Sequence, residues 1–240
     1  MRKLSAIFFD IDDTLYSTSE FARRARSNSI DAMIAAGLRM DRETLLAELD
    51  EVIAEFSSNY GQHFDKLLSR LPKEAVEGLN PAILVASAMV AYHDTKFREL
   101  APYPDAVELL RDLAQTKLIV GVISAGLAIK QAEKVVRLKI GRYMSSNAIF
   151  ISDQIGISKP NPKLYLRACQ SVGVAPAEAM YVGDNPPNDI DPPKSLGMIA
   201  VLNRRSGKYA QIASESAPDY EISNFERLRE ILRADFGISV

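Results

Sequence analysis

Aspartates gather directly after two short apolar stretches of the sequence, residues 4–9 and 180–182. These aspartates are Asp10, Asp12, Asp13, Asp184 and Asp189. Like charges that lie close together raise one another's pKa unless a cation offsets them. Carboxylate oxygens, with no histidine or cysteine nearby in the sequence, favour Mg²⁺ over zinc. The spacing therefore indicates a magnesium site, although the same aspartates could instead cap helices or turns.

A hydroxyl, two small residues and a lysine add the means to bind an anion. Ser124, Ala125 and Gly126 follow a third apolar stretch and precede a helix that we expect to begin at Leu127. A hydroxyl and N–H groups at a helix N-terminus form a ready anion site, and Lys159 supplies the positive charge that a buried phosphate needs. Taken singly, Ser124 could be a helix cap and Lys159 a solvated loop lysine.

The elements that must position these residues alternate between strands and helices. We expect strands at residues 4–9, 118–123, 148–151, 180–182 and 199–202, and helices at 105–114, 127–138, 162–172 and 225–236. This alternation predicts an α/β fold with a doubly wound, Rossmann-like parallel sheet. Ligands bind such a sheet at the carboxyl ends of its strands, where the strand order reverses. We expect all four polar segments, residues 10–14, 124–126, 159 and 183–189, to lie at that edge.

The sequence between the first strand and the rest of the sheet has a different pattern. Helical periodicity with few β-branched runs predicts helices at residues 21–36, 41–56, 64–71 and 81–97. We therefore predict a core domain of residues 1–16 and 101–240 and an inserted α-helical cap domain of residues 17–100. Two short linkers would join them, and we expect the insert to act as a lid over the substrate.

Composition excludes several other classes of protein. The 240 residues carry 29 basic and 31 acidic side chains, and this balance predicts neither a nucleic-acid nor a membrane surface. The single cysteine, Cys169, excludes an intramolecular disulfide and makes the cytoplasm the expected location. The longest uncharged stretch, residues 78–93, is shorter than the ~20 apolar residues that cross a bilayer. The oligomeric state is left open.

The four polar segments, in this order, resemble the haloacid-dehalogenase-like (HAD) hydrolase superfamily. Residues 10–14 are similar to its first motif, D-x-D-x-T, and residues 183–189 to its fourth, G-D-x-x-x-[ND]-D. Ser124 resembles the second motif and Lys159 the third. The helical insert is similar to the C1 cap of this family. Ala125 departs from the asparagine that many relatives have after the second-motif serine.

The resemblance implies a Mg²⁺-dependent phosphatase that acts on a small phosphorylated substrate, such as a triose or sugar phosphate or phosphoglycolate. Asp10 would be the nucleophile that forms an aspartyl-phosphate, and Asp12 would protonate the leaving oxygen and then activate water. Mg²⁺ would be held by the Asp10 carboxylate, the Asp12 backbone carbonyl and the Asp184 carboxylate. The residues expected just outside these ligands are Asp189, Asn188 and Thr14. The groups expected to bind the phosphate are Ser124, the amides of Ala125 and Gly126, and Lys159.

Other functions remain open at this point. A phosphomutase would use the same Asp10 and Asp12. A 2-haloacid dehalogenase is disfavoured, since a departing halide requires no proton from Asp12. A receiver-type signalling domain also places aspartates and a lysine around Mg²⁺, but it has no need of a helical insert to exclude water. Finally, four prolines within residues 186–193 predict a stiff loop, with Asp191 as the N-cap of a following helix.

Overall fold

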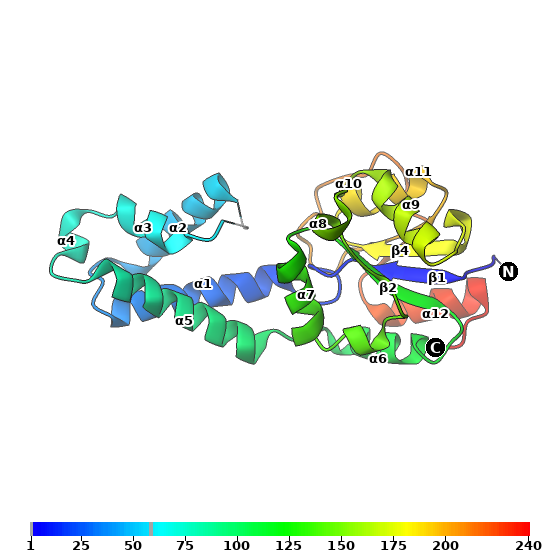
Figure 1. Ribbon diagram of the computed structural model, residues 1–240, viewed down its shortest axis with the longest axis horizontal. Helices are drawn as coiled ribbons and strands as arrows, with labels where there is room; N and C mark the ends of the chain where they lie inside the picture. Colours follow the sequence, from blue (N-terminus) through cyan, green and yellow to red (C-terminus); the bar gives the residue numbers. More distant parts are fainter. Residues whose placement is uncertain (1, 58–59) are drawn as a thin grey trace. The chain divides into compact units, whose positions relative to one another are not determined.

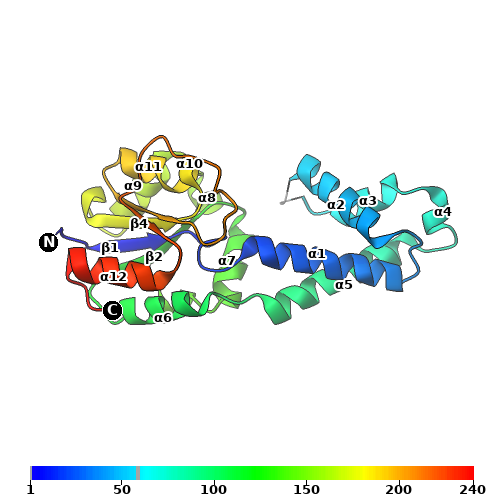
Figure 2. The ribbon, with the colours of Figure 1, turned by 180° about the vertical axis from the view of Figure 1, so that it is seen from behind.

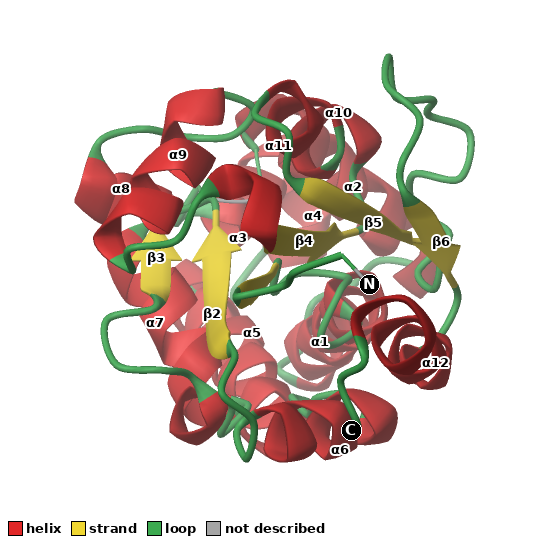
Figure 3. Ribbon diagram, turned by 90° about the vertical axis from the view of Figure 1, so that its right-hand side faces the viewer, coloured by secondary structure: helices red, strands yellow, loops and turns green. Residues whose placement is uncertain are grey.

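The computed structural model of this protein describes residues 2–57 and 60–240. Residue 1 of the predicted core and residues 58 and 59 of the predicted insert lie outside the described residues. The strands are β1 (Ala6–Phe9), β2 (Ile119–Ser124), β3 (Ile149–Ile151), β4 (Ala179–Gly183), β5 (Ile199–Asn203) and β6 (Tyr220–Ile222). They form one parallel sheet in the order β3-β2-β1-β4-β5-β6; Figure 3 labels β3 and β2 on one side of this sheet and β4, β5 and β6 on the other. The predicted doubly wound parallel sheet is confirmed, and its strand order reverses between β1 and β4.

Strand β1 occupies the centre of this sheet. Its side chains are all apolar and buried, because a strand with helices on both faces has no solvent-exposed side. Ala6 lies opposite Ile119 of β2 and Ala179 of β4. The ladder continues one step beyond the strand, where the Asp10 N–H donates to the Val182 carbonyl at 2.9 Å. Asp10 is therefore held at the carboxyl edge of the sheet by its backbone.

Helices cover both faces of the sheet. The helices of this part of the chain are α6 (Pro104–Leu113), α7 (Ala128–Arg137), α8 (Ser152–Ile155), α9 (Pro162–Ser171), α10 (Pro186–Asp189), α11 (Asp191–Ser195) and α12 (Phe225–Phe236). Helices α9, α10 and α11 lie on one face, and α6 and α12 lie on the other (Figures 1 and 2). Phe8 and Tyr165 belong to the core on the α9 side, whereas Phe9 meets Phe225 of α12 edge-on, with ring centroids 6.1 Å apart.

The remaining helices form a second compact unit. They are α1 (Thr18–Ala35), α2 (Arg42–Phe56), α3 (His63–Arg70), α4 (Lys73–Val76) and α5 (Pro81–Glu99). The chain divides into residues 1–19 with 101–240, and residues 20–100, so the first junction falls after Ser19 instead of after residue 16. Helices α1 and α5 run side by side (Figure 2), and a core of its own, including Ile30, Leu45 and Leu84, supports this unit. Its role as a cap stays a prediction.

The proline-rich segment after β4 differs from the expected loop. It forms two short helices, α10 and α11, each with a proline at its first or second position, where the missing N–H costs nothing. The predicted N-cap was wrong: Ile190 is the N-cap of α11, and Asp191 is its first residue. The Asp191 side chain is engaged elsewhere, since its Oδ1 accepts from the Ser216 N–H at 2.8 Å.

Among the residues that the structure describes, no helix combines the length and the hydrophobicity that a membrane span requires.

Candidate active site

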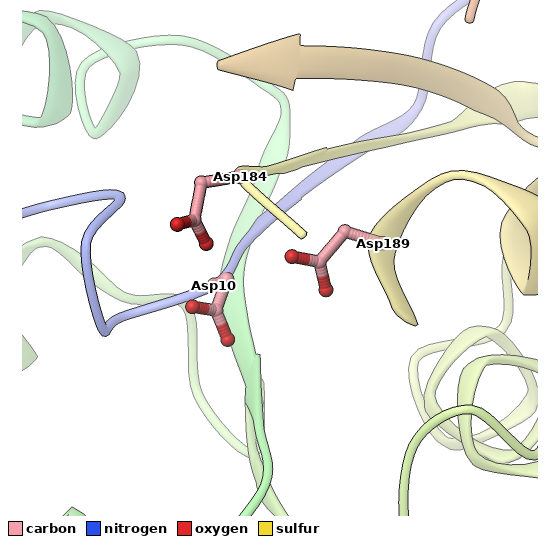
Figure 4. A group of neighbouring side chains, drawn as sticks. All are labelled: Asp10, Asp184 and Asp189. Atoms are coloured by element: carbon pink, nitrogen blue, oxygen red, sulfur yellow. The ribbon is translucent and has the colours of Figure 1, made fainter. Parts of the chain in front are cut away.

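Three carboxylates converge at the point where the strand order reverses. Asp10 follows β1, Asp184 follows β4 and Asp189 ends α10. Each offers one oxygen, and these oxygens all lie within 4.8 Å of one another. Figure 4 shows the three side chains around a common space. All three are buried, so they face one another with little water to screen their charges.

Gly183 makes this convergence possible. A Cβ atom at Gly183 would lie 2.4 Å from Cγ of Asp189, which is far inside van der Waals contact. Without that Cβ, the Asp189 side chain can fold back toward the end of β4, where its Oδ2 accepts from the Asn185 N–H at 3.0 Å. The glycine of the fourth motif is therefore needed for close approach.

Lys159 is the cation of this cluster, and its side chain is only 4 % exposed. Its Nζ lies 2.5 Å from Asp10 Oδ1 and 2.8 Å from Asp189 Oδ1. The third N–H of the ammonium donates to the Tyr181 hydroxyl at 2.6 Å, and this hydroxyl in turn donates to the Ile123 carbonyl at 2.9 Å. Tyr181 was expected only as a strand residue, and its polar contact could not be read from an apolar run.

The cluster holds more negative charge than Lys159 offsets. Burial raises the pKa of Asp10 to about 7, with the Lys159 charge opposing and the Asp189 and Asp12 charges adding to the rise. Burial also raises the pKa of Asp184 to about 8, and the charges of Asp10 and Asp189 add to it. A divalent cation fits this set, because the donors are all oxygens and already lie close together.

The Asp12 carboxylate, one of the five expected at this edge of the sheet, is not part of this group of three. Lys134 of α7 donates to both of its oxygens, at 2.7 and 2.6 Å. Tyr16 and Thr18 also donate to Oδ1, at 2.6 and 2.8 Å. Burial alone would raise the pKa of Asp12, but the Lys134 charge and these hydrogen bonds outweigh it and lower that pKa. Alternate residues beyond β1 thus point to different sites.

Asp13 also lies outside the cluster. Its Oδ2 lies 3.2 Å from Lys208 Nζ and accepts from the Ser19 hydroxyl at 2.9 Å, while its Oδ1 accepts from the Ser19 N–H at 3.0 Å. Asp13 therefore secures the start of α1, and its charge is balanced by a lysine.

The segment predicted to bind phosphate is held by two residues that sequence reasoning missed. The Ser124 hydroxyl donates to Gln131 Oε1 at 3.1 Å, and Gln131 Nε2 donates to the Ala125 carbonyl at 3.1 Å. The Gly126 N–H donates to the Ser152 hydroxyl at 3.0 Å. Helix α7 begins one residue later than expected, with Leu127 as its N-cap. Whether these groups bind a phosphate stays a prediction.

The backbone conformation of Gly126 favours glycine. Its φ of +140° is one that residues with a side chain rarely adopt. A Cβ atom there would lie 2.6 Å from Nε2 of Gln131, so the end of that side chain would have to move from the position in which it donates to the Ala125 carbonyl.

Thr14 and Asn188, expected just outside the metal ligands, have backbone contacts near the cluster. The Thr14 carbonyl accepts from Asn203 Nδ2 at 3.4 Å. The Thr14 hydroxyl is buried and has no hydrogen-bond partner among the described residues. The Asn188 carbonyl accepts from the Tyr165 hydroxyl at 2.5 Å. These contacts support the loops on either side of the three carboxylates.

Comparison with known proteins agrees with this geometry. Residues 4–197 match the family of haloacid dehalogenase-like hydrolases. A glyceraldehyde 3-phosphate phosphatase of Methanopyrus kandleri is 44 % identical over 236 residues, which are 96 % of this chain and 97 % of the relative. A second glyceraldehyde 3-phosphate phosphatase, from Pyrococcus furiosus, is 40 % identical over 239 residues, which are 99 % of this chain and 96 % of the relative.

A solved structure shares the fold over almost the whole chain. The HAD phosphatase of Thermococcus onnurineus superimposes with a TM-score of 0.68 at 23 % identity, covering 95 % of this chain and 98 % of the other. The motif residues predicted from the sequence thus stand on the expected fold, at the expected edge of the sheet. The chain belongs to the haloacid dehalogenase-like hydrolases.

Proposed function

We propose that this protein is a Mg²⁺-dependent phosphatase that hydrolyses a small phosphate monoester, with glyceraldehyde 3-phosphate as its substrate. The observation that carries the reaction is the buried cluster of Asp10, Asp184 and Asp189 with Lys159. The choice of substrate rests on the sequence similarity to two glyceraldehyde 3-phosphate phosphatases over nearly the full length of the chain.

The residues that would hold Mg²⁺ are the carboxylates of Asp10 and Asp184 and the backbone carbonyl of Asp12. Asp189 shares the same space and pairs with Lys159. When bound, the ion offsets charge on the carboxylates and on the phosphoryl oxygens.

The chemistry follows from the two aspartates beyond β1. Asp12 is an ionised carboxylate in the free protein and takes up a proton from solvent as the negatively charged substrate binds beside it. A carboxylate oxygen of Asp10 then forms a bond to phosphorus, the bond from phosphorus to the ester oxygen breaks, and that oxygen takes the proton from the Asp12 carboxyl. Asp12, now a carboxylate, takes a proton from water as the water oxygen attacks the aspartyl-phosphate. Inorganic phosphate leaves and Asp10 is regenerated. The Lys159 ammonium beside Asp10 offsets charge throughout.

We also propose a cytoplasmic location. The only cysteine, Cys169, is buried with a free thiol, and burial raises its pKa to about 11. A single cysteine, which can form no intramolecular disulfide, suits a reducing compartment.

The substrate is tested by measuring phosphate release from a panel of esters with Mg²⁺. We expect kcat/KM for glyceraldehyde 3-phosphate to exceed that for nucleoside monophosphates by about tenfold or more, a difference of about 1.4 kcal/mol in transition-state stabilisation. Phosphoglycolate and hexose phosphates complete the panel. Release of chloride from 2-chloropropionate, or interconversion of hexose phosphates in place of hydrolysis, would contradict the proposal.

The metal site is tested without any substrate. Because an ion bound only to the native state stabilises it by mass action, Mg²⁺ at a hundredfold excess over its Kd contributes about 2.7 kcal/mol. We expect Mg²⁺ to raise the Tm of the wild type and to leave that of Asp184→Ala unchanged. Glu108→Ala, which removes an exposed carboxylate on α6, is the matched control and should respond like the wild type. An Asp184→Ala protein that gains as much in Tm as the wild type would place the ion elsewhere.

A further inference from the structure

A lysine outside the four motifs contacts the proposed acid and base of the reaction. Lys134 Nζ lies 2.7 Å from Oδ1 and 2.6 Å from Oδ2 of Asp12. The Lys134 side chain is 18 % exposed and that of Asp12 is 28 % exposed. An ion pair at an open surface contributes about 0–1 kcal/mol, but this pair is largely enclosed and lies beside the nucleophile strand. Such a pair can fix the orientation of the carboxylate as well as balance its charge.

The other contacts of Asp12 leave one oxygen weakly held. Tyr16 and Thr18 both donate to Oδ1, at 2.6 and 2.8 Å. Besides Lys134, Gln131 Nε2 donates to Oδ2, at the long distance of 3.3 Å. Lys134 is thus the donor that fixes both oxygens at once and sets the rotation of the carboxylate plane.

Helix α7 supplies both of these contacts from one face. Gln131 and Lys134 are three residues apart, so their side chains project from the same side of the helix. Gln131 also binds the Ser124 hydroxyl and the Ala125 carbonyl. This face of α7 therefore links the loop after β1 to the loop after β2, across two neighbouring strands.

We propose that Lys134 is a positioning residue that holds the Asp12 carboxyl in the orientation needed to protonate the leaving oxygen and to activate water. The inference rests on the proposed function, because Asp12 needs an orientation only if it transfers these protons. A general acid must lie within hydrogen-bond reach of the atom that it protonates, and small misplacements cost large factors in rate. A carboxylate held at one oxygen alone can rotate away from that position.

Two substrates with different leaving groups test this role. In kcat/KM, which covers the steps up to departure of the leaving group, glyceraldehyde 3-phosphate requires a proton and p-nitrophenyl phosphate requires almost none. For Lys134→Met we expect kcat/KM to fall by about thirtyfold or more with glyceraldehyde 3-phosphate, within the range that proton transfer contributes, and by less than about threefold with p-nitrophenyl phosphate. Lys134→Arg, which can donate to both oxygens, should recover part of the loss.

The matched control is Lys117→Met, which removes an exposed lysine just before β2, at the opposite edge of the sheet. It should leave both substrates unaffected. Equal losses with both substrates in Lys134→Met, or no loss with either, would overturn the proposal, because a structural defect or a dispensable residue would then account for the result.

A spectroscopic measurement tests the pairing of Lys134 with Asp12 independently of the phosphatase activity. The ¹⁵N resonance of the Lys134 ammonium, assigned by its loss in Lys134→Met, should shift in Asp12→Asn. An unchanged resonance would overturn the pairing whatever the substrate. A wild type that releases no phosphate from any ester would refute the proposed function; Lys134 would then have no proton transfer to position, even if the resonance shifted.

Discussion

Replacing Asp10 with asparagine is expected to abolish phosphate release while leaving the protein folded. The amide fills the same volume and still offers an oxygen to Lys159, which lies 2.5 Å from the carboxylate. It is, however, no nucleophile toward phosphorus. We expect kcat to fall by at least about 10³, which corresponds to about 4 kcal/mol in activation free energy.

Phosphate release and a thermal melt followed by circular dichroism measure the two halves of this prediction. Acid quenching during turnover adds a direct observation, because wild-type protein should retain phosphate covalently and Asp10→Asn should not. The control is Asp112→Asn, which removes a carboxylate on α6 that pairs with Arg229 on α12. We expect its turnover to be near that of the wild type. Turnover within about tenfold of the wild type in Asp10→Asn would remove it from the role of nucleophile.

Replacing Lys159 with methionine is expected to cost the protein much of its stability as well as its activity. The lysine side chain is 4 % exposed, and its partners Asp10 and Asp189 are 10 % and 2 % exposed. Removing one member of a buried ion pair costs about 3–5 kcal/mol, because the remaining charge is left without compensation. Urea unfolding in the presence of a chelator measures this loss without a contribution from bound metal.

A double variant distinguishes charge from packing. If uncompensated charge causes the loss, Lys159→Met combined with Asp189→Asn should be more stable than Lys159→Met alone, since one buried carboxylate has become neutral. Lys117→Met is the surface control and should unfold like the wild type. A double variant that is no more stable than the single one would indicate that lost packing around Tyr181, and not charge, explains the effect.

The sequence was sufficient to predict the positions of those site residues that directly follow strands. Residues 6–9 are apolar because β1 is buried on both faces, and the residues after such runs must meet at one edge of a parallel sheet. The amino-acid pattern alone therefore predicts five aspartates at this edge, and three of them, Asp10, Asp184 and Asp189, lie together. For these residues, the strand pattern and the sheet topology predict the same position.

Contacts between distant segments could not be obtained in this way. Lys134 lies on an amphipathic helix among other charged residues, a pattern that usually marks a solvated face, and nothing in its neighbourhood points to Asp12. Tyr181 sits in an apolar strand, where its ring predicts burial and its hydroxyl predicts nothing. Strand β6 was missed because residues 220–222 contain a glutamate and bury only Ile222, as befits an edge strand.

The central place of β1 has a consequence for the order in which the chain folds. This strand is synthesised first, yet both of its partners come much later, since Ala6 pairs with Ile119 and Ala179. Until those strands exist, an apolar strand stands unpaired and can form wrong pairings. Asp10, the proposed nucleophile at its end, acquires Asp184 as a neighbour only with β4.

We expect the helical unit to shorten this delay. Helices α2 and α3 are close in sequence and pack against one another, and Arg24 Nη1 lies 3.3 Å from Glu99 Oε2, so the two ends of the unit lie close together. A backbone hydrogen bond from the Tyr103 N–H to the Leu15 carbonyl, at 2.9 Å, then joins the flanking segments. If these helices fold early, the closure between β1 and β2 becomes a short one in place of a long and costly one. We therefore expect the insertion to aid the folding of the strand that precedes Asp10.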